Sequence, residues 1–120
     1  MLLHIVARGK IGRSPEAELV DRYLKRISWP TKVTELPDRG GKMPELPANS
    51  VTIALDERGR SLSSMDLAKK LEVWRDGGKR EARFLIGAAT WPHLLVRAML
   101  AEQLFRATSI LANHPYHREG

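Results

Sequence analysis

Short apolar runs alternate with polar, turn-forming residues along this chain. Runs bounded by Gly, Pro, Asp or Ser predict β-strands at residues 2–7, 32–36, 51–55 and 82–87. Apolar residues at helical spacing predict helices at about residues 15–27, 65–75 and 92–112. This order of elements indicates an α/β layer structure with a mostly parallel sheet flanked by helices. Ligands of such folds usually bind beyond the carboxyl ends of the strands.

The residues flanking two of the predicted helices are typical of helix boundaries. Ser14 is a favoured N-cap, and Pro15 follows it in the first turn, where proline is tolerated. Ser63 or Ser64 caps the second helix, and the Gly77-Gly78 pair ends it. Both helices are therefore expected to begin and end close to the limits of their apolar periodicity.

The predicted last helix is apolar around most of its circumference. At 100° per residue, its apolar side chains cover one continuous arc that only Arg97 and Thr108 interrupt. An arginine within an apolar face is costly to bury unless it is paired, so Arg97 should meet a carboxylate, a phosphate or backbone carbonyls. The arc is also wider than one small sheet needs, which predicts a homodimer interface.

The composition fits a single domain spanning residues 1–120, because 42% hydrophobic residues suffice for one moderate core. A net charge of +6 and a pI near 10.1 favour a polyanionic partner, nucleic acid ahead of a membrane surface. The absence of cysteine excludes disulfides and thiolate chemistry and fits a reducing compartment. No segment approaches 18 uninterrupted apolar residues. We therefore expect a cytoplasmic protein without a membrane span.

Histidines are the candidates for proton transfer near neutral pH. His4 lies within a predicted strand, where a structural role is expected. His93 starts the last helix, where capping or packing is as good an interpretation as substrate contact. His114 and His117 belong to a polar cluster beyond that helix and favour a functional role. Carboxylates are too scattered for a paired acid/base site, and no metal-ligand spacing occurs.

Two further groups of residues are candidates for RNA contact. Tyr116 either stacks on a base or packs the tail against the last helix, and Arg118 either binds phosphate or only solvates the end. Surface cations usually face water, but as a set those near the predicted turns favour binding to an RNA backbone. These cations are Arg8, Lys10, Arg39 and Lys42.

Six segments, distributed over nearly the whole chain, resemble one known family. They are Gly9-Lys10, Leu55-Asp56, Leu85-Ile86-Gly87, Trp91-Pro92-His93-Leu94-Leu95-Val96-Arg97, Ala101-Glu102-Gln103-Leu104-Phe105-Arg106-Ala107 and Asn113-His114-Pro115-Tyr116-His117-Arg118-Glu119. The chain resembles the H-type large-subunit ribosomal RNA pseudouridine N3-methyltransferases of the SPOUT superfamily. The C-terminal segment is the specific one, whereas Leu-Ile-Gly alone is weak. The resemblance implies a small homodimer that binds S-adenosylmethionine in a C-terminal trefoil knot and methylates ribosomal RNA.

The resemblance also implies roles for particular residues. The methyl donor is surrounded by backbone at the ends of the third and fourth strands and before the last helix. The C-terminal tail reaches the active site of the partner subunit and helps to place the target pseudouridine. The implied cofactor residues are Leu55, Gly87, Ala89, Thr90 and Trp91, and the implied tail residues are His114, Tyr116, His117 and Arg118. The candidate catalytic residues are therefore His114, Tyr116 and His117. The candidate RNA-binding residues are Arg118 from the tail and, from charge and position rather than from the resemblance, Arg8, Lys10 and Arg97.

One departure from the family pattern affects every functional expectation. The family continues from Leu-Ile-Gly through a loop, a helix and a fifth strand, but here only residues 88–91 separate Gly87 from Pro92. Four residues cannot form a loop wide enough for a helix to thread, so we predict an unknotted chain with an incomplete donor pocket. The deletion is either natural or engineered. The chain is thus either a methyltransferase with impaired or abolished activity, or a non-catalytic basic homodimer that retains some affinity for RNA or the ribosome.

Overall fold

The computed structural model describes residues 1–55, 63–87 and 93–112. This part of the chain forms four strands and three helices. No described helix is long and apolar enough to cross a membrane. In chain order, the strands and helices are β1 (Leu2–Arg8), α1 (Pro15–Arg26), β2 (Thr31–Leu36), β3 (Ser50–Leu55), α2 (Ser64–Asp76), β4 (Glu81–Ile86) and α3 (His93–Ala112).

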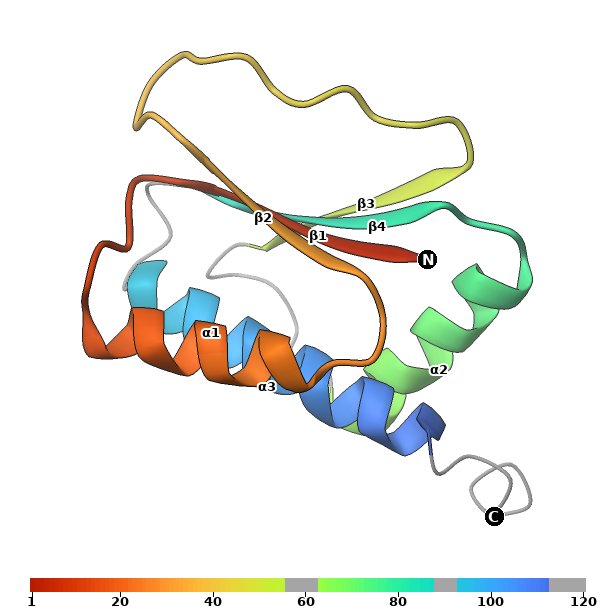
Figure 1. Ribbon diagram of the computed structural model, residues 1–120. Coiled ribbons are helices and arrows are strands. Elements are labelled where there is room, and N and C mark those ends of the chain that lie inside the picture. The colour runs from red at the N-terminus through yellow and green to blue at the C-terminus, as the bar shows by residue number, and fades with distance from the viewer. Residues whose placement is uncertain (56–62, 88–92, 113–120) are drawn as a thin grey trace.

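The four strands form one parallel sheet in the order β2-β1-β4-β3. The crossovers through α1 and α2 move in the same direction across this order, whereas the connection from β2 to β3 moves in the opposite direction. Because parallel crossovers are right-handed, the opposite direction requires the opposite face. All three helices accordingly cover one face of the sheet, and the segment of residues 37–49 crosses the other (Figure 1).

Local signals place the helix boundaries as the sequence predicts. The Ser14 hydroxyl accepts a hydrogen bond from the amide of Ala17 at 3.2 Å, so Ser14 is the N-cap of α1. Ser63 caps α2 in the same way, with the amide of Asp66 at 3.0 Å. Gly78 follows the end of α2 at a φ of 80°, a conformation that favours glycine. The α/β architecture is confirmed.

The main core lies between the sheet and the helices. Successive strand residues point to opposite faces, so alternate residues of β1 and β4 meet the helices. The buried residues of this core include Leu3, Ile5, Ala7, Ala82, Phe84 and Ile86 from the strands and Leu67, Leu71, Leu100 and Leu104 from α2 and α3. Burying one such large apolar side chain stabilises the fold by about 1.5–3 kcal/mol. Residues far apart in the sequence therefore hold α2 and α3 on one face.

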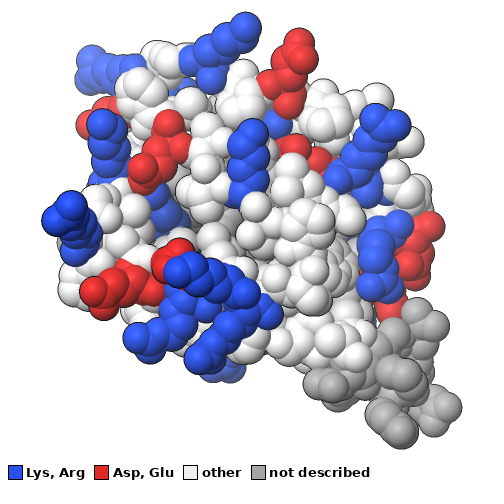
Figure 2. Space-filling model, in the orientation of Figure 1, with Lys and Arg blue, Asp and Glu red and all other residues white. Residues whose placement is uncertain are grey.

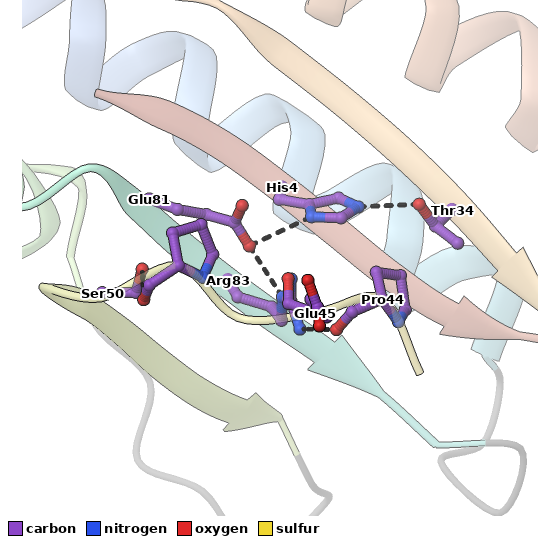
Figure 3. A network of polar contacts seen from close by, with 8 residues as sticks. His4, Thr34, Pro44, Glu45, Ser50, Glu81 and Arg83 are labelled. Atoms are coloured by element: carbon purple, nitrogen blue, oxygen red, sulfur yellow. Dashed lines mark hydrogen bonds and ion pairs between the residues drawn. The ribbon is translucent and has the colours of Figure 1, made fainter. Parts of the chain in front are cut away.

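The opposite face of the sheet is centred on a buried polar network (Figure 3). His4 Nδ1 lies 3.1 Å from Glu81 Oε2, and its Nε2 lies 2.7 Å from the hydroxyl of Thr34. Arg83 donates from Nε to the same Glu81 oxygen at 2.7 Å. Glu81 and Arg83 reach each other because they are two residues apart on one strand and share a face. The predicted structural role of His4 is confirmed.

Arg83 also fastens residues 37–49, called the strap from here on, across this face. Its two terminal nitrogens donate to the carbonyl oxygens of Pro44 and Glu45 at 2.7 and 2.8 Å. A parallel sheet normally has both faces covered, and here the strap covers the face that carries no described helix. The strand predicted at residues 82–87 is corrected to β4, Glu81–Ile86, because Glu81 already pairs with Leu2 of β1 and Ser50 of β3.

Candidate functional site

The carboxyl edge of the sheet brings together two of the predicted cofactor residues. In the strand register, Ile86 lies between Ala7 on one side and Leu55 on the other. Leu55 is the last residue of β3, and Gly87 follows directly after Ile86, the last residue of β4. These two positions therefore end neighbouring strands at the edge where α/β sheets usually bind their ligands.

The turn after β1 lies at the same edge and carries two of the predicted RNA-binding residues. Arg8 donates from one terminal nitrogen to the carbonyls of Pro37 and Gly40, at 3.0 and 2.8 Å, and so fixes the start of the strap. Gly9 has a φ of 89°, which favours glycine, and its amide bonds to the Leu36 carbonyl at 2.7 Å. Lys10, next in the chain, is exposed. Arg8 thus has a structural task, while Lys10 is directed to solvent.

Arg97, the arginine predicted to need a partner within the apolar face of α3, has two. Its guanidinium donates to Glu35 Oε2 at 2.5 Å and to the Gly9 carbonyl at 3.2 Å, and the residue is 1% exposed. Among the described residues, no acceptor lies within hydrogen-bonding distance of its Nε. The expectation of a carboxylate and a backbone carbonyl is met. Because Arg97 is buried and paired, it has a structural role among the described residues. Its contact with RNA remains a prediction.

Glu35, which the sequence did not single out, joins three elements at this edge. Its Oε2 atom accepts from Arg97 of α3 and from the amide of Ile11 at 2.8 Å. Partial burial by itself would raise the pKa of Glu35. The hydrogen bonds from Ile11 and Arg97 and the positive charges of Arg97 and Lys10 outweigh burial and hold that pKa below its ordinary value. Glu35 is therefore stabilised in its ionised form.

Several predicted site residues fall outside the described part of the chain. His93 begins α3, but its side chain is not among those described. The cofactor candidates in residues 88–92 and the catalytic and RNA-binding candidates in residues 113–120 are likewise outside the description. These candidates are Ala89, Thr90, Trp91, His114, Tyr116, His117 and Arg118. Within residues 1–55, 63–87 and 93–112, no group of three His, Cys, Asp or Glu is placed to hold a metal ion.

Basic residues are distributed over the surface, as the net charge of +6 requires. Figure 2 shows Lys and Arg side chains spread over the face in view, including a group that covers the position of α1, with fewer acidic side chains between them. Such a surface attracts polyanions without selecting among them.

Comparison with known proteins identifies the family. A family model described as "Predicted SPOUT methyltransferase" matches residues 1–90 and 87–117. The chain belongs to the SPOUT methyltransferase family. Three relatives carry the name "Ribosomal RNA large subunit methyltransferase H". Those of Novosphingobium aromaticivorans and Rhizorhabdus wittichii are 63% and 61% identical, each with 100% of both chains covered. That of Paramagnetospirillum magneticum is 39% identical, with 98% of this chain and 99% of the relative covered.

The comparisons also bear on the short junction between β4 and α3. The alignment with the Rhizorhabdus protein extends over 140 positions and includes all 120 residues of this chain, so about 20 of its positions have no counterpart here. The family model matches in two pieces that meet at residues 87–90. The missing positions thus fall where the sequence predicted a deletion. Members of the family take their methyl group from S-adenosylmethionine.

Proposed function

We propose that this chain has the architecture of an enzyme that transfers the methyl group of S-adenosylmethionine to N3 of a pseudouridine in large-subunit ribosomal RNA. The printed name of its relatives supports the RNA substrate. The observation that carries the proposal is the adjacency of Leu55 and Gly87 at the carboxyl edge, beside the turn with Arg8 and Lys10. Methyl-donor and RNA-contact positions thereby share one edge. A ribosomal substrate also fits the expected cytoplasmic location.

The direction of α3 supports a site completed by a second copy of the chain. The helix begins beside the carboxyl edge and runs away from it (Figure 1). Its 20 residues, His93–Ala112, span about 28 Å at about 1.5 Å per residue. His114, Tyr116 and His117 lie two to five residues beyond Ala112, a reach of at most about 7 to 18 Å. This reach is shorter than α3, so we propose that in a homodimer the tail serves the carboxyl edge of the partner subunit.

The chemical task assigned to this tail is proton removal and placement of the base. N3 of pseudouridine carries an imide proton that must leave as the methyl group is transferred, and the nitrogen must be held in line with that group. His114 and His117 are the candidates for the proton acceptor. Tyr116 would stack on the base or donate to its carbonyl, and Arg118 would hold a phosphate.

The described residues fit the methyl donor only in part. Leu55 and Gly87 supply backbone at the ends of β3 and β4, but the segment that would form the remaining wall is shorter than in the relatives by about 20 positions. We therefore propose that the chain is unknotted and that its methyl transfer is strongly impaired. The alternative is a non-catalytic basic homodimer that retains RNA or ribosome affinity. The short junction supports this alternative as well, because both proposals require an incomplete donor pocket.

Calorimetric titration with S-adenosylmethionine tests these proposals. The chain would be compared with a matched version carrying the corresponding segment of the Rhizorhabdus protein between Gly87 and Pro92. We expect micromolar binding only by the version with the restored segment. Micromolar binding by the short chain would overturn the proposal that the missing segment disables it.

An assay of the methylation of large-subunit ribosomal RNA by the two versions then distinguishes the impaired methyltransferase from the non-catalytic homodimer. We expect the restored version to methylate the RNA, and the short chain to do so much more slowly or not at all. Retained ribosome binding without methylation by either version would favour the non-catalytic homodimer.

A further inference from the structure

The peptide groups on both sides of Lys10 are hydrogen-bonded to the two members of one ion pair, in addition to the bond from the Gly9 amide to the Leu36 carbonyl. Glu35 Oε2 accepts from the amide of Ile11 at 2.8 Å, immediately after Lys10. Arg97 donates to the carbonyl of Gly9 at 3.2 Å, immediately before Lys10. Because Arg97 is also bonded to Glu35, one carboxylate links α3, β2 and the peptide groups on both sides of Lys10.

We propose that Glu35 is a positioning residue for RNA binding, which acts through the turn of residues 9–11 to direct Lys10 toward an RNA phosphate. This inference rests on the proposed function in that its ligand is RNA. Gly9 has a φ of 89°, and although its amide is bonded to the Leu36 carbonyl, the Gly9 carbonyl and the Ile11 amide are held by Arg97 and Glu35. Fixing the turn before binding removes the cost of ordering it from the encounter with RNA.

The ion pair of Arg97 and Glu35 has two features that do not favour stability or RNA affinity by themselves. Arg97 is 1% exposed and, among the described residues, its Nε has no acceptor. An apolar side chain at position 97 would join the surrounding core without the cost of removing a guanidinium from water. Glu35 also places a negative charge at an edge that is expected to meet phosphate, where charge alone makes it unfavourable. The benefit that offsets both costs is the fixed geometry of the turn.

The charge of Glu35 gives the test an unambiguous sign. Glu35→Gln raises the net charge by one, so electrostatics alone predicts tighter RNA binding. Positioning predicts weaker binding, by about five-fold to ten-fold, because the Lys10 contact is loosened. Asp38→Asn is the matched control, since Asp38 is an exposed carboxylate in the strap near the same edge. The control should bind RNA as tightly as the unchanged chain or more tightly.

Two further measurements distinguish positioning from a general loss of structure. Affinities for a large-subunit ribosomal RNA fragment would be measured for Glu35→Gln, Lys10→Ala and the double variant. If Glu35 acts through Lys10, Glu35→Gln should have little further effect in the Lys10→Ala background, because coupled residues are non-additive. Hydrogen exchange at the Ile11 amide should accelerate in Glu35→Gln, because its acceptor is weakened.

Each outcome decides the inference. Additive effects, or unchanged or tighter RNA binding by Glu35→Gln, would overturn the positioning role and leave the proposed function intact. Failure of the unchanged chain to bind the RNA would overturn both. If Glu35→Gln does not fold, Glu35→Gln/Arg97→Met takes its place, because it leaves no buried unpaired charge and keeps the net charge at +6. The same loss of affinity is expected of that variant, and its absence would also refute positioning.

Discussion

Arg83 is expected to be the most sensitive charged residue of the fold, and Arg83→Met tests this. The substitution keeps a long side chain but leaves the Glu81 carboxylate, itself 5% exposed, without its 2.7 Å partner. Removing one member of a buried ion pair typically costs about 3–5 kcal/mol, because the other charge remains buried. The strap carbonyls of Pro44 and Glu45 also lose their donors, although water can reach the partly buried strap. A loss in this range is a large share of the stability of a small domain.

Urea unfolding followed by circular dichroism measures this loss of unfolding free energy. In thermal unfolding, the melting temperature should fall by about 12–20 °C for a chain of this size. Arg106→Met is the matched control, because Arg106 is 62% exposed and pairs with Glu102 on the surface of α3. That control should lose only about 0.3–0.5 kcal/mol. Trypsin should also cut the strap of Arg83→Met faster, after Arg39 or Lys42. If Arg83→Met costs no more than the control, the network does not hold the strap and the reasoning is refuted.

Two other predictions concern the carboxyl edge and the start of α1. The pKa of Glu35 is lowered in the folded chain, so its ionised form stabilises the fold fully above the ordinary value of 4.5, and this contribution is lost as the pH falls through the folded-state pKa. The difference in unfolding free energy between the unchanged chain and Glu35→Gln should therefore narrow as the pH falls below the ordinary value of 4.5 and through the lowered folded-state pKa of Glu35, and a constant difference would contradict the assignment. Ser14→Ala should lower the unfolding free energy by about 1 kcal/mol, because the amide of Ala17 loses its cap, whereas Ser14→Asp should retain most of the stability. Equal losses in both Ser14 variants would show that capping is not the cause.

Local signals in the sequence predicted every described helix and strand, with boundaries that differ by one residue at several ends. The helix predicted at residues 15–27 is α1 (Pro15–Arg26), and its cap, Ser14, bonds only three residues ahead. The strand predicted at residues 51–55 is β3 (Ser50–Leu55). Caps, turn glycines and apolar periodicity act within one or two turns of the chain, so they can be recognised without knowing the fold.

The same local reasoning failed where a charge is balanced by a distant residue. The strand predicted at residues 82–87 began at Ala82, where the apolar run starts, and so it left out Glu81, whose carboxylate is buried. One of its partners, Arg83, is only two positions away, but the other, His4, lies 77 positions away and reaches Glu81 through the parallel pairing of β1 and β4. Likewise the sequence predicted that Arg97 needs a carboxylate or a similar partner, but it contains 14 acidic residues and gave no reason to choose Glu35.

By itself, the sequence determined the elements, the family resemblance and the short junction after β4, because each is recorded in neighbouring residues or in ordered motifs. Tertiary structure alone decided the distant partners: Glu35 for Arg97, Glu81 for His4, and the strap for the face opposite the helices. The physical reason is that a buried charge must be neutralised by whatever the fold brings within about 3 Å. In this chain, strand order and strand register decide which group that is.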